Sequence, residues 1–146
     1  MIKTILSNTN EETRIWGESL AEILKPGDIV ALIGELGAGK TVLAQGILKG
    51  LGVTEPVQSP SFIMIREYKG HVPVVHIDLY RLRGSEDFEA LGFVEYLDGQ
   101  YVVVIEWADK IADILPMNSY IIHITWGQDH PEQRKITCRR SWKVES

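Results

Sequence analysis

The stretch Gly34-Glu35-Leu36-Gly37-Ala38-Gly39-Lys40-Thr41 decides the fold, because it matches the phosphate-loop pattern G-x-x-x-x-G-K-[ST] at every fixed position. Such a loop turns its backbone N–H groups toward phosphate oxygens, and its glycines remove side chains that would block that approach. In this pattern the lysine reaches the β- and γ-phosphates, and the final hydroxyl can ligate Mg²⁺. The loop therefore predicts a site for a nucleoside triphosphate.

The residues on either side of the loop support this interpretation. Ile29-Val30-Ala31-Leu32-Ile33 is a continuous apolar run of the kind found in buried parallel strands. After the loop, apolar residues recur with the spacing of an amphipathic helix, at Ala44, Ile47, Leu48 and Leu51. A strand, a glycine loop and a helix in this order place a phosphate at the N-terminus of the helix.

The rest of the chain alternates strands and helices. We expect a capped helix from Thr9 to Pro26 with one apolar face, made of Trp16, Leu20, Ile23 and Leu24. Further strands are predicted at residues 3–6, 62–68, 72–82, 101–105, 120–126 and 134–140, and short helical segments at 85–97 (interrupted at Gly92) and 109–115. The predicted fold is a single α/β domain over residues 1–146, of the P-loop NTPase class. Its central sheet would be mostly parallel and flanked by helices, with an antiparallel hairpin appended.

Bulk properties narrow the class of protein. The chain has 146 residues, of which 45% are hydrophobic and 24% charged, as in an ordinary globular domain. It contains no apolar run long enough to span a bilayer and no secretory signal, so we expect no membrane association. The single cysteine, Cys138, predicts a cytoplasmic protein. Because Cys138 alternates with Ile136 in a strand-like segment, a structural thiol is favoured over a nucleophile.

The net charge of −5 argues against nucleic-acid binding by the fold as a whole, because affinity for phosphate backbones comes from clustered Lys and Arg. One local cluster is present, formed by Arg139, Arg140 and Lys143. It could be a basic patch or simply a solvated strand end.

A phosphate loop also needs a carboxylate near Mg²⁺, usually at the end of a neighbouring strand. Glu106 directly follows the apolar run 102–105, and Asp78 ends the run 74–77. We assign Glu106 to Mg²⁺ or its water, and Asp78 to the attacking water or a switch contact. The alternative for each is a strand-end carboxylate that makes a cap or a surface pair.

Several other residues could take part in chemistry. His76 shares a strand face with Asp78, and a packed, hydrogen-bonded histidine is favoured over a zinc ligand because no third ligand is in view. Ser59-Pro60-Ser61-Phe62 is either a loop that senses the γ-phosphate or an ordinary turn. Trp107 is most simply a core or interface aromatic. Three arginines could stabilise transition-state charge: Arg81, Arg83 and Arg134.

The guanine-reading run Asn-Lys-x-Asp is absent from the sequence, so adenine is the favoured base. On the motifs quoted so far, together with the string His76-Ile77-Asp78-Leu79-Tyr80-Arg81-Leu82 and the pair Glu106-Trp107, the chain resembles the TsaE (YjeE) family. These are small ATPases of bacterial tRNA threonylcarbamoyladenosine synthesis. The resemblance covers nearly the whole chain.

The resemblance implies an ATPase that works on partner proteins, the TsaD–TsaB heterodimer, with slow hydrolysis of ATP that resets the complex between turnovers. Contact with tRNA would be indirect, through that complex. By motif position it implies that Thr41 and Glu106 hold Mg²⁺, and that Lys40, Asp78 and Glu106 act in catalysis. ATP or ADP contacts are expected from Thr13, Gly34, Glu35, Leu36, Gly37, Ala38, Gly39, Lys40, Thr41, Val42 and Arg134. A small-molecule kinase and a non-hydrolysing, nucleotide-gated adaptor remain as alternatives.

Overall fold

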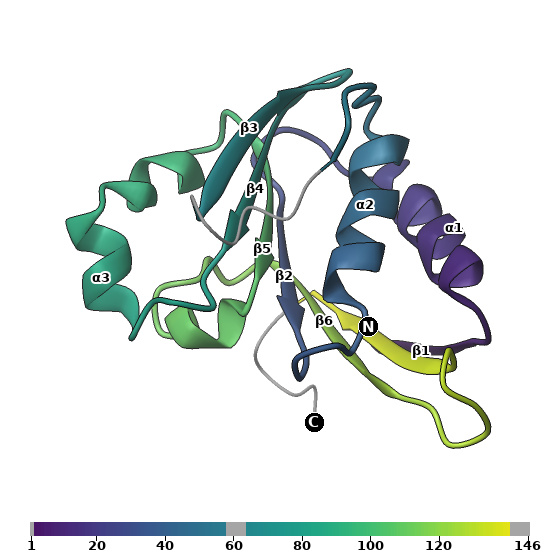
Figure 1. Ribbon diagram of the computed structural model, residues 1–146. Coiled ribbons are helices and arrows are strands. Elements are labelled where there is room, and N and C mark those ends of the chain that lie inside the picture. Colours follow the sequence, from purple (N-terminus) through teal and green to yellow (C-terminus); the bar gives the residue numbers. More distant parts are fainter. Residues whose placement is uncertain (1, 58–63, 141–146) are drawn as a thin grey trace.

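The computed structural model describes residues 2–57 and 64–140, which form one α/β unit around a seven-stranded sheet (Figure 1). The strands are β1 (Ile2–Ser7), β2 (Ile29–Ile33), β3 (Ile65–Lys69), β4 (Pro73–Asp78), β5 (Val102–Glu106), β6 (Tyr120–Trp126) and β7 (Arg134–Arg139). The α-helices are α1 (Asn10–Ala21), α2 (Lys40–Gly50) and α3 (Ser85–Ala90), and two 3₁₀ helices are η1 (Phe93–Leu97) and η2 (Ala108–Ile111).

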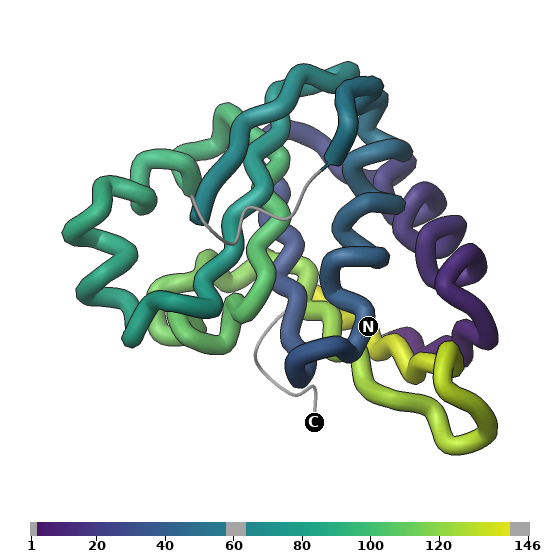
Figure 2. The backbone as a smooth tube through the Cα atoms, in the orientation of Figure 1, coloured from purple at the N-terminus to yellow at the C-terminus, as the bar shows by residue number. Residues whose placement is uncertain are grey.

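The sheet is mixed, with the strand order β1-β7-β6-β2-β5-β4-β3. Its four central strands, β6, β2, β5 and β4, are parallel to one another. Strand β3 pairs antiparallel at one edge, while β7 and β1 pair antiparallel at the other. The prediction of a mostly parallel sheet with one hairpin therefore understated the antiparallel part. Short connections turn the chain back at both edges, and β1 joins β7 from the far end of the sequence (Figure 2).

Both faces of the sheet are covered. Helices α1 and α2 pack on one face, and α3 with the two 3₁₀ helices lies on the other (Figure 1). Side chains of β2 alternate between these layers, because Val30 and Leu32 join the α1–α2 core whereas Ile29 and Ala31 join the opposite core. The continuous apolar run of β2 is thus explained by burial on both faces, as expected of a central parallel strand.

Three elements differ from expectation. The strand predicted over residues 72–82 ends at Asp78, because the Asp78 carboxylate accepts a hydrogen bond of 2.9 Å from the Tyr80 N–H and turns the chain. The segments at 93–97 and 108–111 are 3₁₀ helices, short connectors of the kind common between other elements. Ile23, expected on the inner face of α1, is 60% exposed because the helix has already ended at Ala21.

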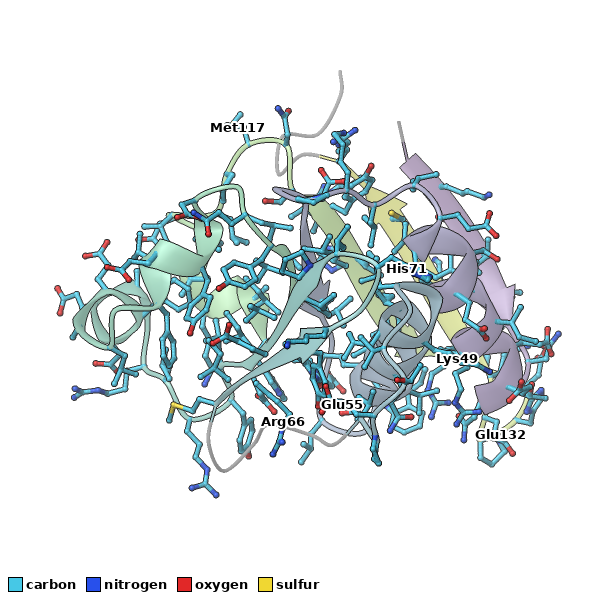
Figure 3. The ribbon with its side chains drawn as sticks, turned by 90° about the horizontal axis from the view of Figure 1, so that it is seen from above. Lys49, Glu55, Arg66, His71, Met117 and Glu132 are labelled. Carbon is cyan, nitrogen blue, oxygen red and sulfur yellow. The ribbon has the colours of Figure 1, made fainter. Side chains whose placement is uncertain are left out.

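Helices α1 and α2 touch through glycines. A Cβ added at Gly46 would lie 2.2 Å from the Arg14 carbonyl oxygen, and one at Gly17 would lie 2.8 Å from the Leu43 carbonyl oxygen. We expect Gly46→Ala to lower the free energy of unfolding by about 1–3 kcal/mol, because the overpacking outweighs the gain in helix propensity. Urea denaturation measures this change. The control is Lys49→Ala on the exposed side of α2 (Figure 3), and equal stability of the two variants would contradict the close contact.

Candidate functional site

The glycine-rich loop, residues 34–41, links the end of β2 to the start of α2 (Figure 1). Two of its glycines adopt left-handed backbone conformations, with φ of 80° at Gly37 and 104° at Gly39, which explains glycine at these positions. At Gly34 the structure shows a reason for glycine that the sequence did not reveal. A Cβ there would lie 2.5 Å from the Ile124 carbonyl oxygen, so Gly34 allows close packing against β6.

A cavity of about 510 Å³ opens beside this loop. Its walls combine loop residues, two carboxylates, two arginines and two aromatic side chains. The lining consists of Asn10, Leu36, Gly37, Gly39, Lys40, Thr41, Val42, Asp78, Tyr80, Arg81, Glu106, Trp107 and Arg134. Nine residues expected from the sequence to bind nucleotide, hold metal or act in catalysis therefore share one cavity: Leu36, Gly37, Gly39, Lys40, Thr41, Val42, Asp78, Glu106 and Arg134.

The two candidate carboxylates lie side by side on neighbouring strands. The register of β4 against β5 pairs Asp78 with Glu106, and these residues are only 5% and 2% exposed. The Thr41 hydroxyl donates a hydrogen bond of 3.1 Å to Oε1 of Glu106, so the first turn of α2 contacts the end of β5. A hydroxyl and a carboxylate in contact at the edge of a cavity suit Mg²⁺, which prefers oxygen ligands.

Among residues 2–57 and 64–140, no cluster of three or more His, Cys, Asp or Glu side chains could hold a metal ion. His76 is fully buried and hydrogen-bonded to Glu106, as expected of a packed histidine. A Mg²⁺ ion at Thr41 and Glu106 would need further oxygen ligands from phosphate and water, as this ion commonly takes them.

Lys40 lies folded across the loop with its ammonium group at the cavity. Its Nζ donates hydrogen bonds of 2.5 Å to the Gly34 carbonyl and 2.7 Å to the Glu35 carbonyl. Burial lowers the pKa of Lys40, and the nearby carboxylates of Glu106 and Asp78 oppose this shift. The lysine is thus positioned within the loop by backbone acceptors, with its charge close to both carboxylates.

Trp107 lies against this lysine. Nζ of Lys40 is 4.1 Å from the centroid of the Trp107 ring, and the ring of Tyr80 is 5.1 Å away, centroid to centroid. The Trp107 backbone is left-handed, with φ of 60° and ψ of 36°, which is costly for a bulky residue and typical of functional sites. Trp107 packs partly buried against the core, in agreement with its interpretation as a core or interface aromatic, but that interpretation did not include its contact with Lys40. The position of Trp107 directly after Glu106 in the sequence was the one feature from which a place at the site could have been predicted.

The three candidate arginines occupy different places. Arg134 is 7% exposed and lines the cavity, and its Nε donates a hydrogen bond of 2.7 Å to the Ala38 carbonyl of the loop. Arg81 also lines the cavity. Arg83 pairs with Asp87 and has a side chain that is 91% exposed, and it does not line the cavity. Only the first two can act on a ligand bound there.

Three loop residues expected to bind nucleotide lie on the other side of the loop. Gly34, Glu35 and Ala38 line a second cavity of about 530 Å³, together with Trp107, His123 and Trp126. Thr13 is 1% exposed, with its hydroxyl oxygen 2.6 Å from that of Ser7, and it does not line the first cavity. Asn10, one turn earlier on α1, does line it, although no motif marked Asn10 beyond its place after the Thr9 cap.

Comparison with known proteins identifies the family to which this chain belongs. The family model "Threonylcarbamoyl adenosine biosynthesis protein TsaE" matches residues 7–136. This chain belongs to the TsaE family. It is 42% identical over 128 residues to a Bacillus subtilis protein named "tRNA threonylcarbamoyladenosine biosynthesis protein TsaE", an alignment that covers 87% of this chain and 78% of that protein. A Treponema pallidum protein of the same name is 39% identical over 132 residues, covering 90% and 96% of the two chains.

The fold agrees with that of a solved structure. The crystal structure of Bacillus subtilis YdiB is similar to this chain with a TM-score of 0.80 and 36% identity, over 97% of this chain and 88% of that one. The resemblance to the TsaE family seen in the sequence is therefore confirmed. Two of the TsaE motifs beyond the loop, residues 76–82 and Glu106-Trp107, contribute residues to the first cavity. The motif at 59–62 lies outside the described residues, so the proposed γ-phosphate sensor stays a prediction.

The two described residues of the basic cluster, Arg139 and Arg140, do not line this cavity. Arg140 lies 3.5 Å from Asp28, measured from Nη2 to Oδ1, and its guanidinium is 4.5 Å from the centroid of the Tyr120 ring. Tyr120 begins β6, at the end of the sheet opposite the glycine-rich loop. Lys143 lies outside the described residues. Within residues 2–57 and 64–140, no helix is long and apolar enough to cross a membrane.

Cys138 fits the expected structural thiol. The residue is half-buried on β7, and burial raises the pKa of its thiol, so less thiolate is present at pH 8 than for an ordinary cysteine. We expect iodoacetamide to alkylate Cys138 several-fold more slowly in the folded protein than in the protein unfolded by urea, with the gap closing as the pH rises through the raised pKa. Mass spectrometry follows the reaction. A folded protein that reacts as fast as the unfolded one would argue for an exposed, reactive thiol.

Proposed function

We propose that this chain is the ATP-binding, slowly ATP-hydrolysing subunit that acts with a TsaD–TsaB heterodimer to form threonylcarbamoyladenosine in tRNA. Hydrolysis resets the complex between turnovers. The observation that carries the nucleotide part is the contact of 3.1 Å between the Thr41 hydroxyl and the Glu106 carboxylate, at the mouth of a glycine-rich loop that holds Lys40. Membership in the TsaE family supports the tRNA modification part.

Five side chains of the cavity have a role in this proposal, together with the loop backbone. Backbone N–H groups of the loop and the Lys40 ammonium bind the phosphates. Thr41 and Glu106 hold Mg²⁺, which neutralises charge on the β- and γ-phosphates when bound. Asp78, paired with Glu106 in the β4–β5 register, orients the attacking water. Arg134, through its bond to the Ala38 carbonyl, braces the loop from β7.

Slow hydrolysis by the isolated chain is expected because one of its two cavity arginines, Arg134, is tied to backbone carbonyls. The guanidinium of Arg134 is held by hydrogen bonds to the carbonyls of Ala38, Pro131 and Gln133, so its position is fixed by the loop and by the β6–β7 connection. A finger arginine must reach the charge that develops between the β- and γ-phosphates, and its absence costs about 10³–10⁵ in rate. We infer that the heterodimer supplies or orders the missing group, in the cytoplasm and with tRNA bound only through the complex.

The reset can be tested by counting turnovers of tRNA threonylcarbamoylation. TsaD–TsaB without this chain, or with this chain and a non-hydrolysable ATP analogue, should complete about one turnover per complex. With the chain and ATP, turnovers should continue. Continued turnover with the analogue would favour a non-hydrolysing adaptor. Transfer of the γ-phosphate to a metabolite, measured with labelled ATP, would instead favour a kinase.

A further inference from the structure

His76 lies next to the paired carboxylates of Asp78 and Glu106, on the side away from the cavity. It is on β4, on the same face as Asp78, and in the register its neighbours are Val104 on β5 and Arg66 on β3. Asp78 and Glu106 form the next pair on that face toward the cavity. His76 is fully buried and does not line the cavity, so it cannot touch a bound nucleotide.

Its one hydrogen bond in the described part of the chain goes to Glu106. The His76 Nε2 atom lies 2.7 Å from Oε2 of Glu106, whereas Nδ1 is buried and has no hydrogen-bond partner among residues 2–57 and 64–140. A carboxylate accepts hydrogen bonds and does not donate them, so we assign the ring proton to Nε2. The distance is at the short end for a bond from N–H to a charged oxygen, as strong bonds of this kind are.

The two oxygens of Glu106 therefore have different partners. Oε2 is held from behind by His76, and Oε1 is held at 3.1 Å by the Thr41 hydroxyl on the side of the cavity. Two donors on opposite oxygens fix the rotation of the carboxylate about its last bond. Without the donor behind it, a buried carboxylate oxygen would be left unsatisfied, and the group would turn toward other donors.

We propose that His76 is a positioning residue, which holds Oε2 of Glu106 so that Oε1 faces Thr41 and the metal they share. This inference rests on the proposed function, because it gives Glu106 a metal to bind. The histidine acts only through Glu106 and touches neither phosphate nor metal. Removal of such a partner behind a metal ligand typically costs 10–100-fold in metal affinity.

The test compares His76→Leu, which keeps an apolar side chain but has no donor, with His76→Gln, whose amide nitrogen can replace Nε2. His123→Leu is the matched control, because His123 is half-buried on β6 and faces the other side of the sheet. The binding of Mn²⁺ to each protein, saturated with the β,γ-imido analogue of ATP, is measured by electron paramagnetic resonance. Affinity for the analogue alone is measured by calorimetry in EDTA.

We expect His76→Leu to bind Mn²⁺ at least about tenfold more weakly, with analogue affinity in EDTA unchanged within about twofold. His76→Gln should restore most of the Mn²⁺ affinity, and His123→Leu should bind as the wild type does. Wild-type Mn²⁺ affinity in His76→Leu would overturn the proposal, as would an equal loss of metal-free analogue binding.

If His76→Leu does not fold, His76→Asn replaces it, because its shorter amide cannot reach Oε2 of Glu106. Weak Mn²⁺ binding by His76→Asn beside normal binding by His76→Gln would support the inference, and equal binding by the two would overturn it. A wild-type protein that binds neither analogue nor Mn²⁺ would instead show that the proposed function itself fails.

Discussion

Lys40→Ala is expected to abolish tight nucleotide binding while the protein stays folded. Among the described residues the ammonium group donates hydrogen bonds only to the Gly34 and Glu35 carbonyls of its own loop, and it lies over the Trp107 ring, so we expect its charge to serve a ligand more than the core. A charged hydrogen bond to phosphate contributes about 1.5–3 kcal/mol, so the loss of two or more should weaken ATP affinity at least ~100-fold.

Calorimetric titration with ATP and Mg²⁺ measures this effect, and circular dichroism reports the fold. Lys110→Ala is the matched control, because Lys110 also donates to two backbone carbonyls, those of Tyr80 and Leu82, but does not line the cavity. A folded Lys40→Ala protein with unchanged ATP affinity would contradict the phosphate-loop interpretation. An equal loss in both variants would point to loop anchoring instead of phosphate contact.

Glu106→Ala and Asp78→Ala should both bind nucleotide and lose hydrolysis, for different reasons. Glu106→Ala removes a carboxylate from the Thr41 hydroxyl and from Mg²⁺, so the Mg²⁺ dependence of hydrolysis should be lost with the activity. The Asp78→Ala protein should keep its metal affinity. Its rate of ATP hydrolysis should fall by a factor of about 10²–10⁴, the usual contribution of a positioned base.

The assay is phosphate release in the presence of TsaD–TsaB, with Glu67→Ala as control. Glu67 accepts hydrogen bonds from the hydroxyls of Tyr96 and Tyr101 and does not line the nucleotide cavity. Wild-type rates in Asp78→Ala would show that its carboxylate serves only to turn the chain after β4, through its bond to the Tyr80 N–H.

The sequence predicted the site residues whose role depends on their neighbours along the chain. The glycine-rich loop and the carboxylates that end two apolar runs predicted most of the cavity, because parallel strands bring their carboxyl ends to one edge of the sheet. Asp78 and Glu106 lie 28 residues apart in the chain, yet the β4–β5 register places them side by side.

Other features depend on contacts between distant segments and could not be read from local order. Gly34 owes its identity to the approach of β6, and Arg134 crosses from β7 to the loop carbonyl of Ala38. The predicted role of Thr13 overlooked its hydroxyl contact with Ser7 on β1. The antiparallel pairing of β1 with β7 likewise joins the two ends of the described chain, which no local pattern of hydrophobicity encodes.

The most direct test of the whole account is ATP hydrolysis by the purified chain, measured alone and during titration with a TsaD–TsaB heterodimer. We predict slow, Mg²⁺-dependent release of phosphate by the chain alone and a rate that rises and saturates as heterodimer is added, because the partner completes a site in which one of the two cavity arginines, Arg134, is tied to the loop. Fast hydrolysis by the isolated chain that the heterodimer leaves unchanged would contradict the account, and so would the absence of hydrolysis at any ratio of the two.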